Sequence, residues 1–162
     1  MNRQALITSL ALRTGKHVDV LNRYKDSALA EMFNNIQPLQ LNYEQVSLLL
    51  KSIRNTNGAS YRPSTGELNP TTGYMCALAG FEKQVPRVWN SYDLQQVLNE
   101  WLSEISYTGD SAASIGLWEN DGTLYLDLSQ HFVDRDKAVA MGHQRNQLAI
   151  WDCANKCEIK TC

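Results

Sequence analysis

The stretch Ala113–Gln130, ASIGLWENDGTLYLDLSQ, predicts a β-hairpin more strongly than any other part of the chain predicts its structure. Asp121 and Gly122 lie between two runs of alternating apolar residues. This dipeptide is typical of a two-residue hairpin loop because both residues tolerate positive φ. A loop at these positions places Asn120 opposite Thr123, and the register of the whole hairpin follows from that pair.

The predicted register gives the hairpin two different faces. Trp118 lies opposite Tyr125, and both point to the same side as Asp127. A cross-strand aromatic pair stabilises a sheet by roughly 0.2–1 kcal/mol, so the pair is interpreted first as a hairpin clamp and second as an exposed binding patch. Period-2 alternation assigns the other face to the core, and that face carries Ile115, Leu117, Leu124, Leu126 and Leu128.

A helix is predicted directly after the hairpin, from Arg135 to Arg145. Asp134 precedes it with the side chain of a good N-cap. Ala138 and Gly142 are four residues apart and form a ridge of small side chains. Since a glycine costs about 1 kcal/mol inside a helix, Gly142 predicts a close approach of this helix to the sheet.

Four further strands and one further helix complete the predicted core. Leu148–Trp151 is apolar on both faces, which indicates an inner strand, and Glu158–Thr161 is expected to pair with it as an edge. The other elements are a short strand at Ala59–Arg62, an inner strand at Tyr74–Phe81 and an amphipathic helix at Ser91–Ile105. The expected fold is α+β, with a mostly antiparallel sheet of five or six strands and two covering helices.

The first third of the chain reads as helical. Helices are predicted over residues 3–13, over Asp26–Phe33 with Asp26 as its cap, and over Tyr43–Arg54 after a capping box at Asn42. The following loop is rich in Pro, Gly and Asn. We therefore expect two units, a helical N-terminal unit over residues 1–56 and an α+β core over residues 57–162.

The charge distribution excludes two classes of function. The net charge is −2 over 162 residues. Residues 1–56 carry seven Lys and Arg against four Asp and Glu, a net of +3, and residues 57–162 carry eight against thirteen, a net of −5. Neither value fits a protein that mimics DNA by massed carboxylates or coats DNA by charge alone. No signal-peptide pattern or apolar run of membrane length is present, so a cytoplasmic location in a bacterial host, without membrane contact, is expected.

A DNA-binding function is one alternative. Ala11, Gly15 and Leu21 match the small residue, turn glycine and core aliphatic of a helix-turn-helix. Lys16 and Arg23 lie in the same segment and are the candidate contacts to DNA. An ordinary helical hairpin explains the same three positions.

Catalytic and metal-binding patterns are weak. His131, Asp134, Asp136 and His143 could gather around a metal, but cap and first-turn roles explain the two acids, and no nucleophile has a persuasive base. A small hydrolase or nuclease-like enzyme remains a second alternative. No cofactor is indicated.

The cysteines give no clear site. Cys76 lies in an apolar run and is interpreted as a buried small hydrophobe. Cys153, Cys157 and Cys162 are spaced differently from the usual zinc-binding pairs. A hairpin at residues 154–156 would bring Cys153 opposite Cys157, which leaves a disulfide or a metal as alternatives to free thiols.

The segment from Ala138 through Gly142 to Asn146–Asp152 resembles parts of small accessory proteins of phages and plasmids, as does Thr72–Tyr74 to a lesser extent. The resemblance implies a protein that binds and blocks a host machine, of the anti-CRISPR or anti-restriction type. The expected partner is a host protein or a protein–nucleic-acid complex, with direct nucleic-acid contact as a further option. Trp118, Tyr125 and Arg145 are the candidate anchors. The oligomeric state is left open.

Overall fold

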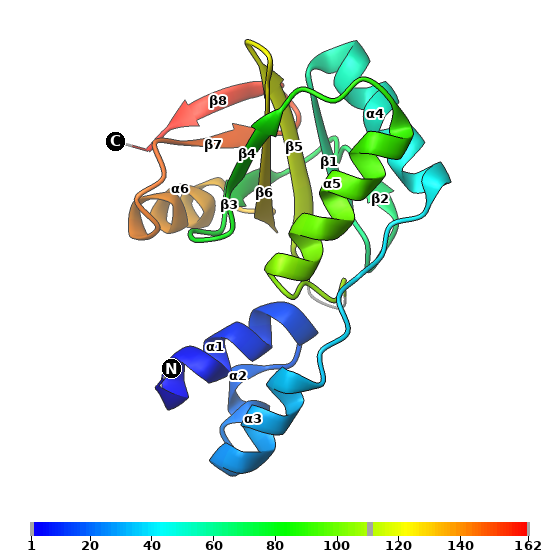
Figure 1. Cartoon of the computed structure of the whole chain (residues 1–162). Coiled ribbons are helices and arrows are strands. Elements are labelled where there is room, and N and C mark those ends of the chain that lie inside the picture. The colour runs from blue at the N-terminus through cyan, green and yellow to red at the C-terminus, as the bar shows by residue number, and fades with distance from the viewer. Residues whose placement is uncertain (1, 110–111, 162) are drawn as a thin grey trace.

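The computed structural model describes residues 2–109 and 112–161, apart from the side chain of Leu12, and it has the expected α+β architecture (Figure 1). Helices come first, and a sheet with interleaved helices follows. The helices are α1 (Arg3–Thr14), α2 (Val18–Leu21), α3 (Asp26–Asn34), α4 (Tyr43–Thr56), α5 (Ser91–Glu104) and α6 (Arg135–Gln144). The strands are β1 (Gly58–Arg62), β2 (Glu67–Leu68), β3 (Tyr74–Ala77), β4 (Lys83–Pro86), β5 (Ser114–Asn120), β6 (Thr123–Phe132), β7 (Ala149–Asp152) and β8 (Cys157–Lys160).

The β5–β6 hairpin has the predicted register. Asn120 pairs with Thr123 and Trp118 with Tyr125. The loop residue Asp121 has φ 47° and Gly122 has φ 77°, so both adopt the left-handed conformation that this loop requires. The five aliphatic residues assigned to the core are all buried.

The sheet has more strands than the sequence predicted. Its order is β2-β1-β5-β6-β3-β7-β8, β4 also pairs with β6, and every pairing is antiparallel. The prediction of one strand over Tyr74–Phe81 was wrong, because β3 ends at Ala77 and the chain then leaves the ladder. It returns as β4 along the same side of the long strand β6. The break falls at Gly80, whose φ is 90°.

Helices α4 and α5 cover the apolar face of the hairpin (Figure 1). The predicted capping box at Asn42 and Gln45 is confirmed, and Asn90 caps α5. Val46, Leu49 and Ile53 of α4 belong to the same core as the hairpin. The apolar stripe of α4 therefore packs on the sheet, although the predicted division at residue 56 places this helix in the N-terminal unit.

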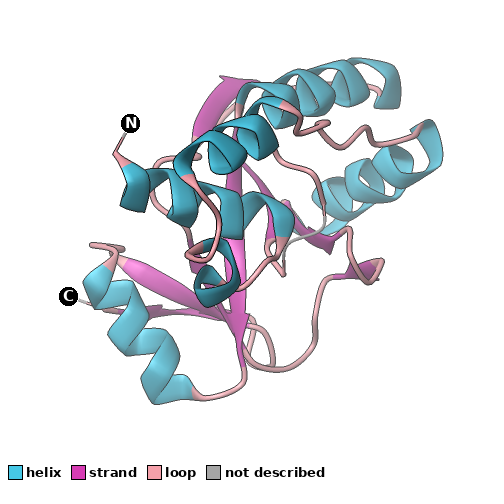
Figure 2. Ribbon diagram, turned by 90° about the horizontal axis from the view of Figure 1, so that it is seen from below, coloured by secondary structure: helices cyan, strands magenta, loops and turns pink. Residues whose placement is uncertain are grey.

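Helix α6 covers the opposite end of the same sheet, away from α4 and α5 (Figures 1 and 2). Asp134 caps it as predicted, by accepting a hydrogen bond from the Lys137 amide. Ala138 packs against Cys76 and Ile150 in a separate core. Strand β7 is an inner strand and β8 pairs with it, also as predicted. Leu148 precedes β7 and is 73% exposed, so its expected burial was wrong.

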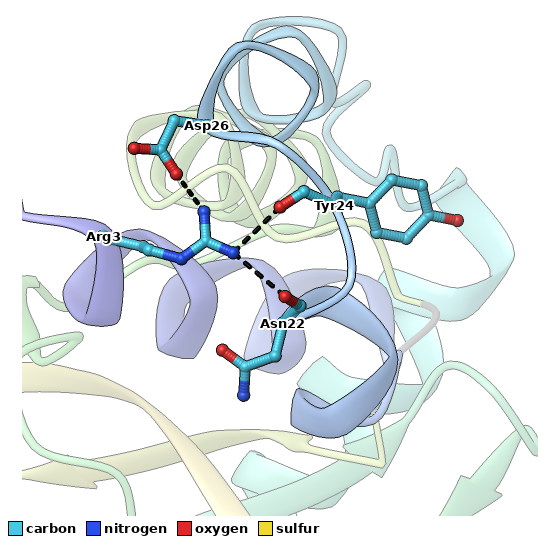
Figure 3. Close-up of polar contacts among 4 residues, drawn as sticks. All are labelled: Arg3, Asn22, Tyr24 and Asp26. Atoms are coloured by element: carbon cyan, nitrogen blue, oxygen red, sulfur yellow. Dashed lines mark hydrogen bonds and ion pairs between the residues drawn. The ribbon is translucent and has the colours of Figure 1, made fainter.

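The first three helices form a small unit with its own core around Ile7, Leu10, Leu21 and Leu29. Arg3 of α1 joins this helix to the segment between α2 and α3 (Figure 3). Its guanidinium donates to the carbonyls of Asn22 and Tyr24, at 3.0 and 2.9 Å, and pairs with Asp26. Asp26 was predicted as a helix cap, but Lys25 occupies the cap position and the Asp26 carboxylate is engaged by Arg3 instead.

The helix-turn-helix interpretation does not match this geometry. Gly15 does end α1 in the left-handed conformation, with φ 71°, and Leu21 is buried as that motif requires. The helix after the turn, however, has only the four residues Val18–Leu21. A recognition helix must reach along the major groove, and one helical turn is too short for that.

Candidate binding surface

The outer face of the hairpin carries an aromatic pair that α4 and α5 do not cover. The ring centroids of Trp118 and Tyr125 are 5.3 Å apart and the ring planes are tilted by 35°. Trp118 is 50% exposed. In the neighbouring strands, Gly58 of β1 lies opposite Trp118 and Gln84 of β4 lies opposite Tyr125. Gly58 has no side chain, and a Cβ added there would lie 3.8 Å from Cδ1 of Trp118.

A second exposed tryptophan, Trp89, lies at the same end of the sheet, just before the cap of α5. It is 66% exposed. The Arg87 guanidinium carbon lies 4.2 Å from the centroid of its ring, and that of Arg54 lies 5.8 Å away. Arg54 also donates to the Trp89 backbone carbonyl. Two cations therefore hold the indole in place, by an interaction worth about 0.5–1 kcal/mol each at an exposed site.

Glu119 of β5 holds the arginine next to Trp89. Its carboxylate lies 2.9 Å from Nε of Arg87, and its backbone amide donates to the carbonyl of Asn57 at the end of α4. Trp118 is its neighbour in the strand and points to the other face. Arg54, Arg87 and Trp89 therefore lie on the side of the hairpin that α4 and α5 cover, and Trp118 and Tyr125 lie on the opposite side. We call these five residues the aromatic–arginine surface; it consists of two patches, one on each face of the sheet, near the tip of the β5–β6 hairpin.

A carboxyl group lies on the same face of the hairpin as the aromatic pair. Asp127 follows Tyr125 on the same face, and Ser129 Oγ donates to its Oδ1 at 2.9 Å. A Cβ added to Gly116, directly opposite, would overlap this carboxyl group. Burial of the group raises the pKa of Asp127, the hydrogen bond from Ser129 opposes the rise, and the charge of Glu82 adds to it.

Arg145 does not belong to this surface. Its Nη1 lies 3.4 and 3.5 Å from the carbonyl oxygens of Cys76 and Ala77, and its Nη2 donates to Oε1 of Gln130. These contacts fix the end of α6 to strands β3 and β6. Arg145 therefore has a structural role, and its contact with a partner stays a prediction.

Lys16 and Arg23 belong to the three-helix unit and not to the sheet that carries the hairpin. Both are exposed, and Lys25 beside them is exposed as well. Lys16 borders a cavity of about 360 Å³ between α1, α3 and the segment that leads to the core. The structure therefore separates the two groups of predicted contact residues onto different parts of the molecule.

Within residues 2–109 and 112–161, no three His, Cys, Asp or Glu side chains are grouped as a metal site would require. His131 Nε2 lies 2.7 Å from the carbonyl oxygen of Thr72. Cys157 pairs with Asp152 across the β7–β8 hairpin, so the expectation that Cys153 would lie opposite Cys157 was wrong. Cys162 falls outside the described residues.

Sequence reasoning missed three members of the surface, namely Arg54, Arg87 and Trp89. The sequence position of Trp89 could have drawn attention to this residue. It lies between Pro86 and the cap of α5, where no helical or strand periodicity explains a large aromatic residue. Its contact with Arg54, 35 residues earlier, depends on the packing of α4 beside α5 and had no local signal.

Comparison with family models, curated proteins and solved structures finds no match to this chain. Among the residues described, no helix has the length and apolar character needed to cross a membrane.

Proposed function

We propose that the protein is a non-enzymatic inhibitor, encoded by a mobile genetic element, that binds a component of a bacterial defence system in the cytoplasm. The observation that carries this proposal is the aromatic–arginine surface. Trp, Tyr and Arg are the residues most enriched among the energetic anchors of protein interfaces. Here two tryptophans and a tyrosine are held by their neighbours, so little side-chain entropy is lost when a partner covers them.

The resemblance of the segment around Ala138–Asp152 to phage and plasmid accessory proteins supports the choice of partner. Proteins of such elements often bind and block a host machine, and anti-restriction and anti-CRISPR proteins are among them. Stoichiometric binding also suits a site whose conspicuous feature is a set of exposed aromatic rings and cations. The charge distribution would orient the molecule on a larger complex and raise the association rate.

A plating assay tests the proposal. The protein is produced in strains that carry a restriction or a CRISPR system, and plating of a targeted phage is compared with plating on the same strains without it. We expect plating to rise at least tenfold in a susceptible strain. The double variant Trp89→Ala/Trp118→Ala should lose the effect, whereas Tyr43→Ala, which removes another exposed aromatic residue, should keep it. Unchanged plating in every strain would overturn the proposal.

A DNA-binding accessory function is the second candidate. The observation in its favour is the exposure of Lys16 and Arg23 on the basic first part of the chain. Contact with the phosphate backbone would weaken steeply with salt. A salt-sensitive mobility shift of duplex DNA that Lys16→Glu/Arg23→Glu abolishes would favour this function, and no shift at low salt would remove it.

A further inference from the structure

Strand β8 is an edge of the sheet, longer than the edge strand β2 and without the proline that ends β4 (Figure 1). Strand β2 has only two residues, Glu67 and Leu68, and β4 ends in Pro86. Very short strands and prolines are common means of preventing pairing with another chain. Strand β8 has four residues and no proline, and Cys157, Glu158 and Lys160 are exposed.

The direction of the β8 backbone groups follows from one hydrogen bond. The Thr161 amide donates to the Leu148 carbonyl at 3.0 Å, so the polar groups of Thr161 face β7. Successive residues of a strand alternate in this respect. The N–H and C=O groups of Ile159 therefore also face β7, where Ile159 pairs with Ile150. Those of Glu158 and Lys160 point away from the sheet.

The sequence Glu158-Ile159-Lys160 is complementary to itself in an antiparallel arrangement. If two copies pair with Ile159 opposite Ile159 of the second copy, each Glu158 faces a Lys160. The outward backbone groups then form four hydrogen bonds, since Glu158 and Lys160 make a hydrogen-bonded pair on each side of the two-fold axis. Opposite charges directly across a strand pair are stabilising, and like charges are destabilising.

The side chains of β8 have positions that suit antiparallel pairing of two copies. Glu158 and Lys160 lie on the same face of β8, with Lys160 Nζ 3.3 Å from Glu158 Oε2 within the chain. Two copies would join these into a group of four alternating charges. Ile159 points to the other face, where it packs half-buried beside α6, and would contact the second Ile159. We propose that the protein forms a two-fold symmetric dimer through its β8 edge, which joins the two sheets into one.

The edge is short, so the dimer should be weak. An interface of this size is below that of stable complexes, and a dissociation constant between about 10 µM and 1 mM is expected. The chain has a mass of 18.3 kDa, and sedimentation velocity over this concentration range should show a shift toward twice that mass.

Charge-reversal variants of the full chain test the pairing. Glu158→Lys places Lys opposite Lys at both ends of the interface, and Lys160→Glu places Glu opposite Glu. Each should raise the dissociation constant roughly tenfold or more. An equimolar mixture of the two variants restores opposite charges at every position, so it should dimerise as tightly as the unaltered protein. Glu100→Lys and Lys51→Glu make the same charge changes at exposed helix positions and should leave dimerisation unchanged.

Two results would overturn the proposal. One is an unaltered protein that remains at 18.3 kDa at about 1 mM. The other is a dimer that both single variants form as readily as the unaltered protein, because another surface would then hold it.

Discussion

Gly116 and Asp127 depend on each other, because the missing side chain of the glycine leaves the space in which the carboxyl group lies. The sequence indicated that Asp127 would share a face with Trp118 and Tyr125. It gave no sign that the carboxyl group would be enclosed, since alternation assigns a residue to a face but does not say what covers that face.

The raised pKa of Asp127 has a consequence for stability. A carboxyl group whose pKa is higher in the folded than in the unfolded chain favours folding when it is protonated. Its contribution is fully present below the ordinary value of 3.8 and is lost as the pH rises through the raised pKa. Asp127→Asn keeps an acceptor for Ser129 Oγ and removes the titration.

Urea unfolding over a series of pH values measures this effect. We expect Asp127→Asn to be more stable than the unaltered protein at pH 7, by a margin that shrinks as the pH falls and disappears below about 3.8. A variant that is less stable by the same amount at every pH would show that the carboxylate is not penalised in the folded state.

The cysteines should differ in reactivity. Burial raises the pKa of Cys153 from 9.0 to about 11, and the charges of Asp152 and Glu67 add to the rise. A pKa of about 11 in place of 9.0 lowers the thiolate fraction near neutral pH roughly a hundredfold. Cys157 is exposed. Iodoacetamide should therefore modify Cys157 well before Cys153, as peptide mass spectrometry over time would show; equal rates would contradict the described burial.

At the scale of elements, Gly142 illustrates a prediction that needed only local sequence. The added Cβ of an alanine would lie 2.8 Å from Cγ2 of Thr161 and 3.1 Å from Cγ2 of Ile150. Alanine favours a helix over glycine by about 1 kcal/mol, but overpacking typically costs about 1–3 kcal/mol. Crowding should prevail here because both contacts are to β-branched side chains with few alternative rotamers.

We therefore expect Gly142→Ala to lower the free energy of unfolding by about 1 kcal/mol in denaturant titration. Ala140→Gly, at an exposed position of the same helix, calibrates the helix propensity alone. A Gly142→Ala protein that is more stable than the unaltered chain would mean that α6 does not approach β7 and the C-terminal segment as described.

Other elements could not be predicted because their signals are not local. The Asp121-Gly122 loop fixed the hairpin register within a few residues of sequence. Strand β4 has no alternation and ends in Pro86, and it is a strand only because β6 is long enough to pair with both β3 and β4. The stripe of α4 indicated that this helix packs on something, but not that the partner would be the sheet.

At the scale of the whole molecule, the two groups of candidate contacts serve different hypotheses. Lys16 and Arg23 lie on the three-helix unit, which has its own core and a short connection to the rest of the chain. Trp89 and Trp118 lie at the hairpin tip, where Arg54 and Arg87 complete the aromatic–arginine surface. Variants of one group should leave the folding of the other unaffected, so the two functions can be tested separately.

The central claim is that the aromatic–arginine surface binds a protein partner. Affinity capture from lysates of bacteria that carry restriction or CRISPR systems, quantified by mass spectrometry, tests it most directly. We expect one defence protein to be captured in equimolar amount by the unaltered protein and by Tyr43→Ala, and to be lost with Trp89→Ala/Trp118→Ala although the double variant still unfolds cooperatively above the capture temperature. The claim would be contradicted if no equimolar protein partner is captured, or if the double variant captures the same partner equally well.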